Sequence, residues 1–224
     1  MSPQAVAAKS KNNFYLEKPI YTKAGENYLL PAEEKKLWST LKRRAGKQSS
    51  RDWALLKTCR LVALRRGEAI ALDVGDVSYN GATIKDQLVV DETIAKKGAT
   101  GMVIIPRELN NILAAYLRQK RAWGESLELD APLFVSRKGE RMAPRTFNDL
   151  MEKWCREADI PIYTPHALRH TKAQRIMADY HLLRPEEQQK KLQFVAKQLR
   201  HKAFSSTVIY TAPTKEEMTR VAEV

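Results

Sequence analysis

The chain has 224 residues, of which 43% are hydrophobic and 29% charged, and its 39 Lys and Arg residues outnumber 26 Asp and Glu residues, giving a formal net charge of +13. This length suits one domain with an arm and can bury a sizeable core. No apolar run approaches the roughly 18 residues of a membrane span, the start lacks the apolar stretch of a secretory signal, and two distant cysteines argue against a disulfide scaffold or zinc site.

The positive charge is concentrated in one segment. Eleven basic residues lie between Lys35 and Arg66, and Asp52 is the single acid among them. Clustering of this kind is typical of proteins that bind nucleic acid. We therefore predict a nucleic acid as the partner, no membrane, and a basic face for its phosphates built from Lys42, Arg43, Arg44, Lys47, Arg51 and Arg66.

The N-terminal half predicts an arm followed by helices. Residues 1–29 are polar and irregular. Pro31 at a first helical position, with acids in the first turn and bases in the last, predicts a helix over 31–44. A second helical segment begins at Ser49 or Ser50, is broken by Gly67 and closes at the Gly75 turn.

After the second helical segment, the spacing of apolar residues changes to the alternation that is typical of strands. Residues 82–106 are rich in Val, Ile and Thr and predict a small antiparallel sheet, with a hairpin tip at 96–101. The remainder predicts an amphipathic helix, a loop, a short strand or extended piece, and four further helices. These segments are 107–123, 124–132, 133–136, 145–158, 166–180, 185–200 and 205–211. The fold class is α+β, mainly α, with one main domain.

Short motifs could carry chemistry, but each has an ordinary explanation. In TPHALRHT, Thr164 and Pro165 begin a helix that places His166, Arg169 and His170 within one turn. No acid lies between the histidines and the arginine would repel a cation, so we predict an anion there and no metal. An Arg65–Glu68 pair is usually a surface salt bridge, lysines are common at hairpin tips, and a tyrosine in an apolar segment usually packs.

The chain resembles the tyrosine recombinase family, also called the phage integrase family. The resemblance rests on four motifs that occur together and in the family's order: ALRRGEAIAL, the hairpin lysines, HALRH and LRHKAFSSTVIY. The resemblance runs from about residue 30 to Tyr210. It implies a catalytic domain over 30–224 and double-stranded DNA as the partner, which makes the basic face the predicted DNA-binding face. The separate N-terminal DNA-clamping domain that is usual in the family is not expected, because residues 1–29 are too few to form it. The resemblance also implies Arg65, Lys97, His166, Arg169, His201 and Tyr210 as catalytic residues, with Glu68 and His170 in support.

The chain departs from the family pattern at three places. Ala63 stands where the family usually has Gly before Leu-Arg, and Arg200 replaces the Gly of the LGH box. The gap of 32 residues from Arg169 to His201 is longer than expected, and the extra length falls in HLLRPEEQQKK.

The resemblance implies DNA cleavage by Tyr210 through a 3′-phosphotyrosine, with no cofactor, metal or ATP. In this mechanism the guanidinium groups of Arg65 and Arg169 bind the non-bridging phosphate oxygens, and His201 donates a further hydrogen bond to the same phosphate. His166 is the base that takes the tyrosine proton, and Lys97 is the acid that protonates the 5′ oxygen. We expect a site-specific recombinase that performs integration, excision, inversion or resolution. It would act as a tetramer on DNA, in the cytoplasm and nucleoid of a prokaryote, and be encoded there or on a mobile element. A non-catalytic DNA-binding protein on this scaffold and a type IB topoisomerase-like enzyme remain alternatives.

The segment after Tyr210 generates a prediction. Residues 213–224 look helical after Pro213, and the family resemblance implies that such a segment docks on a neighbouring protomer. Deleting them should weaken synapsis of two DNA sites, measured by gel shift, more than it weakens single-site cleavage. An equal loss of both activities would contradict this role.

Overall fold

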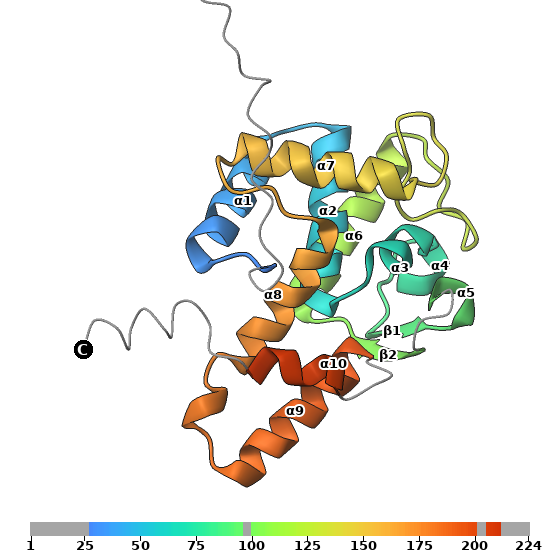
Figure 1. Cartoon of the computed structure of the whole chain (residues 1–224). Coiled ribbons are helices and arrows are strands. Elements are labelled where there is room, and N and C mark those ends of the chain that lie inside the picture. The colour runs from blue at the N-terminus through green and yellow to red at the C-terminus, as the bar shows by residue number, and fades with distance from the viewer. Residues whose placement is uncertain (1–26, 96–99, 201–204, 212–224) are drawn as a thin grey trace, which may run out of the picture.

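Helix α2 (Lys47–Val62) runs through the middle of the protein. The structure is a computed structural model that describes residues 27–95, 100–200 and 205–211 (Figure 1). From Ser49 to Val62 every residue of α2 is buried or half-buried, as expected for a helix surrounded by others. Helices α1 (Pro31–Arg43), α6 (Arg107–Ala122) and α8 (Pro165–Met177) pack against it.

The remaining elements extend this helical body. They are α3 (Arg66–Ala71), α4 (Val74–Val77), β1 (Gln87–Val90), α5 (Glu92–Ala95), β2 (Gly101–Ile104), α7 (Pro144–Glu157), η1 (Tyr180–Leu182), α9 (Pro185–Leu199), α10 (Ser205–Val208) and η2 (Ile209–Thr211). Strands β1 and β2 pair antiparallel, with Gln87 opposite Ile104 and Val90 opposite Gly101. The expected α+β, mainly helical fold is confirmed.

The break after α2 differs from the prediction. The sequence placed it at Gly67, but Gly67 lies inside α3. The helix ends instead at Ala63, whose backbone is left-handed (φ 56°, ψ 40°). Helix α3 then begins because the Glu68 carboxylate accepts a hydrogen bond from the Arg65 amide at 2.7 Å.

The connection between the strands is also not the simple hairpin that was expected. Strand β1 ends at Val90 because Asp91 starts a helical turn: its carboxylate accepts hydrogen bonds from the amides of Thr93 (2.9 Å) and Ile94 (3.1 Å). Part of the expected tip, 96–99, lies outside the described residues. Segment 133–136 is an extended piece whose Val135 makes one isolated bridge to Arg141.

The described residues form two hydrophobic cores. The larger fills the space around α2, α6 and α7. The smaller lies where α8, α9 and η2 meet, in the lower part of Figure 1, and consists of Ala63, Ala173, Met177, Leu192, Val195, Leu199 and Tyr210. Because Tyr210 belongs to this smaller core, its position depends on the packing of α9 against α8.

Ala63 provides a test of the break after α2. A side chain in the left-handed region costs about 1–2 kcal/mol, so Ala63→Gly relieves strain while it loses a buried methyl group and gains unfolded-state freedom. We expect the free energy of unfolding in urea to change by less than about 0.5 kcal/mol. The matched control Ala115→Gly, inside α6, should lower it by about 1 kcal/mol. Equal losses in both variants would contradict the assignment.

Candidate active site

Helix α8 carries three of the predicted site residues on its first turns. Thr164 precedes the helix in an extended conformation and Pro165 occupies the first helical position. His166 and His170 follow one turn apart, with ring centroids 4.5 Å apart and the rings edge to face. The N-terminal end of α8 therefore presents imidazoles where a helix also favours an anion.

The Arg169 guanidinium joins the ends of two helices. It is almost fully buried and donates to the carbonyl oxygen of Ala63 at 2.6 Å and to that of Leu199. These carbonyls belong to the C-terminal ends of α2 and α9, which lack partners within their own helices. Burial, followed by the charges of Arg65 and Arg200, lowers the pKa of Arg169 to about 10, so it is still protonated at pH 7.

Arg65 is held at the start of α3 by Glu68. Its Nη1 atom donates to Glu68 Oε1 at 2.7 Å, and its backbone amide donates to Glu68 Oε2. The Arg65 side chain remains 32% exposed, whereas that of Glu68 is 2% exposed. The buried carboxylate thus fixes one edge of a guanidinium that solvent, or a ligand, can still reach.

His166 lies in a positive environment. Burial lowers its pKa below 6.5, and the charges of Arg169 and Arg65 lower it further, against the opposite effect of Glu68. At pH 7 this imidazole is therefore mainly neutral and able to accept a proton.

The phenol of Tyr210 reaches the same helix. Its oxygen lies 2.6 Å from Nδ1 of His170, and the two rings are tilted with centroids 5.6 Å apart. Burial raises the pKa of Tyr210 to about 12, although the charge of Arg169 opposes the rise. Of the two histidines on α8, it is His170 that has this hydrogen bond.

The structure thus brings together six of the predicted residues, on three segments: Arg65, Glu68, His166, Arg169, His170 and Tyr210. Lys97 and His201 lie outside the described residues. Within the part of the chain that is described, no group of three or more His, Cys, Asp and Glu side chains is arranged to hold a metal ion, and no helix is long and apolar enough to cross a membrane.

Much of the basic segment is paired with acids, of which Asp52 lies within the segment and the others lie outside it. Seven of its eleven basic residues form salt bridges, namely Lys36, Arg44, Lys47, Arg51, Lys57, Arg60 and Arg65. Arg51 is a correction to the predicted DNA-binding face, because it is buried against Asp52 and donates to the carbonyl of Val135 at 3.0 Å. Lys42 and Arg43 are exposed, and Arg66 donates to Asn148 at 3.0 Å.

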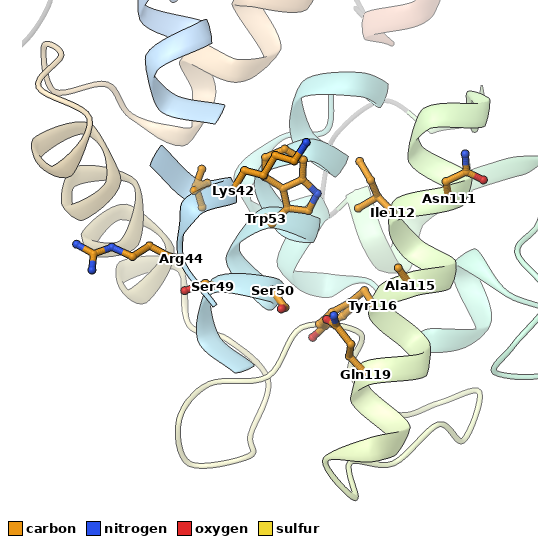
Figure 2. Close-up of a pocket in the computed structure, with 11 residues that line it drawn as sticks. Lys42, Arg44, Ser49, Ser50, Trp53, Asn111, Ile112, Ala115, Tyr116 and Gln119 are labelled. Atoms are coloured by element: carbon orange, nitrogen blue, oxygen red, sulfur yellow. The ribbon is translucent and has the colours of Figure 1, made fainter. Parts of the chain in front are cut away.

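A cavity of about 370 Å³ lies elsewhere, between α1, α2 and α6 (Figure 2). Lys42 and Arg44 line it on one side, and Ile112 and Tyr116 on the other. From Ser50 in its wall to Ala63 at the end of α2 is about 20 Å along the helix, at 1.5 Å per residue. The cavity is therefore separate from the site around Tyr210.

Sequence reasoning missed Arg200 as a member of the site. Its Nη2 atom donates to Glu68 Oε2 at 2.5 Å, so the same carboxylate holds Arg65 and Arg200. Arg200 also has a left-handed backbone (φ 51°, ψ 51°), as does Ala63. The available signal was that both residues stand where the resembled family has glycine, the residue that adopts this conformation most easily.

Comparison with known proteins agrees with this geometry. The model of the phage integrase family matches residues 27–217. Tyrosine recombinase XerC of Bifidobacterium longum subsp. infantis is 26% identical over 185 residues, covering 78% of this chain and 47% of the relative. Tyrosine recombinase XerC of Methylobacterium sp. (strain 4-46) is 31% identical over 175 residues, covering 75% and 49%. The chain thus spans about half the length of the curated relatives it matches.

Solved structures show the same fold. The crystal structure of XerA recombinase superposes with a TM-score of 0.66 at 22% identity, covering 91% of this chain and 65% of that one. XerH site-specific recombinase bound to its difH substrate gives 0.62 at 20% identity, covering 87% and 53%. With a family model matched over nearly its whole described length, the chain belongs to the phage integrase family.

Proposed function

We propose that this chain is a site-specific DNA recombinase that cleaves and rejoins DNA through a 3′-phosphotyrosine intermediate. The observation that carries the proposal is the convergence of a phenol, two guanidinium groups and two imidazoles from η2, α3 and α8 in one place. The similarity to XerC, and to XerH bound to its DNA substrate, supports DNA as the partner.

The two arginines are suited to the charge of the reaction. When Tyr210 attacks the phosphorus, negative charge grows on the non-bridging oxygens, and preorganised cations near those oxygens lower the barrier. Arg65 is partly exposed and Arg169 remains protonated despite its burial. A guanidinium group can bind a phosphate through two parallel hydrogen bonds, and the partly exposed Arg65 is the one placed to do so, because both Nη atoms of Arg169 already donate to carbonyls. This charge compensation requires neither a metal ion nor ATP.

The phenol needs help to lose its proton. With a pKa of about 12, only about one Tyr210 in 10⁵ is ionised at pH 7, so a preformed phenolate contributes little. A base must therefore take the proton as the attack proceeds. The 2.6 Å contact favours His170 for this step, and the neutral His166 ring is in edge-to-face contact with the His170 ring.

The remaining steps follow the family resemblance. The bond from Tyr210 to phosphorus forms as the bond to the 5′ oxygen breaks, and that oxygen takes a proton, a role assigned to Lys97. A 5′-hydroxyl from a second strand then attacks the phosphotyrosine, which restores Tyr210 and joins the strands. Exchange between two duplexes requires several protomers, for which we propose a tetramer on DNA.

Covalent trapping tests the proposed nucleophile. Nicked suicide duplexes drawn from the sequence that flanks the gene should give an adduct that survives denaturing electrophoresis. Tyr210→Phe should abolish the adduct because the attacking oxygen is gone. The matched control Tyr116→Phe removes another buried hydroxyl, which donates to the carbonyl of Leu133, and should keep the rate within about threefold.

Other outcomes identify the alternatives. Tight DNA binding without any adduct would support a non-catalytic DNA-binding protein. Adducts accompanied by relaxation of every supercoiled plasmid, whatever its sequence, would support a topoisomerase-like enzyme.

The pH dependence tests the imidazoles. Because burial lowers the pKa of His166 below 6.5, the neutral imidazole stays the major form as the pH falls to 6.5 and becomes the minor form only at lower pH. If neutral His166 is required, the rate of adduct formation should stay level from pH 8 to about 6.5 and then fall. His166→Asn, which does not titrate, should remove this acid limb.

The corresponding variant His170→Asn shows which of the two histidines is the base. Loss of the acid limb in His170→Asn alone would assign the titrating base to His170. An acid limb that survives in both variants would contradict a role for either imidazole as the base.

A further inference from the structure

Arg200, at the end of α9, is in a position that lowers the stability of the fold. Its side chain is 2% exposed, and within the described part of the chain its Nε and Nη1 atoms are buried without a hydrogen-bond partner. A buried donor without an acceptor costs about 1–3 kcal/mol, and a non-glycine residue in the left-handed region costs about 1–2 kcal/mol. Stability alone therefore does not account for an arginine at this position, and costs of this kind concentrate at functional sites.

The fold makes room for this side chain. A Cβ atom added to Gly101, at the start of β2, would lie 3.1 Å from Cδ and 3.2 Å from Cγ of Arg200. Gly101 therefore allows the strand to approach the arginine stem closely. The stem is held between α9 and β2, and its charged end is directed to Glu68.

The end of α9 also contacts the neighbouring arginines, through the carbonyls of Arg200 and Leu199. The carbonyl oxygen of Arg200 lies 3.5 Å from Nη2 of Arg65, and the adjacent carbonyl of Leu199 accepts a hydrogen bond from Arg169. The left-handed turn at residue 200 thus directs its side chain to Glu68 and its backbone toward Arg65. Arg200 is therefore linked to Arg65 directly and through Glu68, whereas Arg169 is bonded to the preceding residue, Leu199.

We propose that Arg200 is a positioning residue for Arg65: through the shared Glu68 carboxylate it fixes the Arg65 guanidinium for phosphate binding and adds a third positive charge beside the phosphate site. Loss of the Arg200–Glu68 bond would allow the carboxylate, and with it Arg65, to shift. A misplacement of about 1 Å can cost about 100-fold in rate. The role of Arg200 rests on the proposed recombinase function.

Adduct formation on suicide DNA, measured with folded protein, tests the role. Arg200→Met removes the charge and the donors, and we expect the rate to fall about 10- to 100-fold. Arg200→Lys keeps a charged donor for Glu68 and should recover most of the rate, while Arg200→Gln, which keeps a donor without charge, should recover less. The control Arg60→Met breaks another largely buried ion pair, to Glu34, and should leave the rate of the folded fraction unchanged.

A neutral substrate separates positioning from a purely structural effect. A methylphosphonate at the scissile position lacks one of the charged oxygens that Arg65 would compensate. On that substrate the defect of Arg200→Met should shrink to within about threefold of wild type, as expected for lost charge compensation. If Arg200→Met unfolds, the Lys and Gln variants make the same comparison.

Two results would overturn the inference while leaving the recombinase function intact. One is a folded Arg200→Met protein that forms adducts at the wild-type rate. The other is an equal defect on both substrates, which would indicate a structural role only. If the wild-type protein forms no adduct at all, the proposed function fails, and the role of Arg200 fails with it.

Discussion

The buried carboxylate of Glu68 is the interaction on which the site depends. It accepts hydrogen bonds from the backbone and side chain of Arg65 and from the side chain of Arg200. Burial raises the pKa of Glu68, but Arg200 and Arg65 outweigh this effect and hold it below its ordinary value. An ionised carboxylate in this position joins the start of α3 to the end of α9, two segments 132 residues apart in sequence. Without it, two guanidinium groups would face each other with no anion between them, which is strongly unfavourable in a buried setting.

Local patterns predicted most of the helices and the small sheet, because acids, prolines and apolar spacing act over a few residues. The break between the helices was wrongly placed at Gly67 because a glycine is the stronger local signal. The left-handed turn at Ala63 is stabilised by tertiary contacts instead: the carbonyl of Ala63 accepts a hydrogen bond from the Arg169 guanidinium, and Ala63 itself packs in the smaller core. The helical turn after β1 depends on hydrogen bonds to the Asp91 carboxylate. It was not predicted, because Asp91 lies in a segment rich in strand-forming residues.

The candidate site was predictable where spacing along one helix decides proximity. HALRH predicted a helix start with His166, Arg169 and His170 together, and α8 begins at Pro165. Sequence alone did not indicate that His170 is the imidazole in contact with Tyr210, because that contact joins residues 40 positions apart. Arg200 was noticed only as a departure from a family pattern, since its partner lies on another helix. The roles of Lys97 and His201 stay predictions.

The paired state of the basic segment has a consequence for how the protein would find DNA. A cation releases counterions from DNA only when it neutralises a phosphate, and the salt dependence of binding grows with the number of such contacts. Seven of the eleven cations in this segment already face a carboxylate of their own chain. The segment would therefore act on distant DNA as a much weaker polycation than its composition suggests. Long-range attraction would then come from the net charge of +13 of the whole chain rather than from this segment, and recognition from the fit of the duplex against the folded surface.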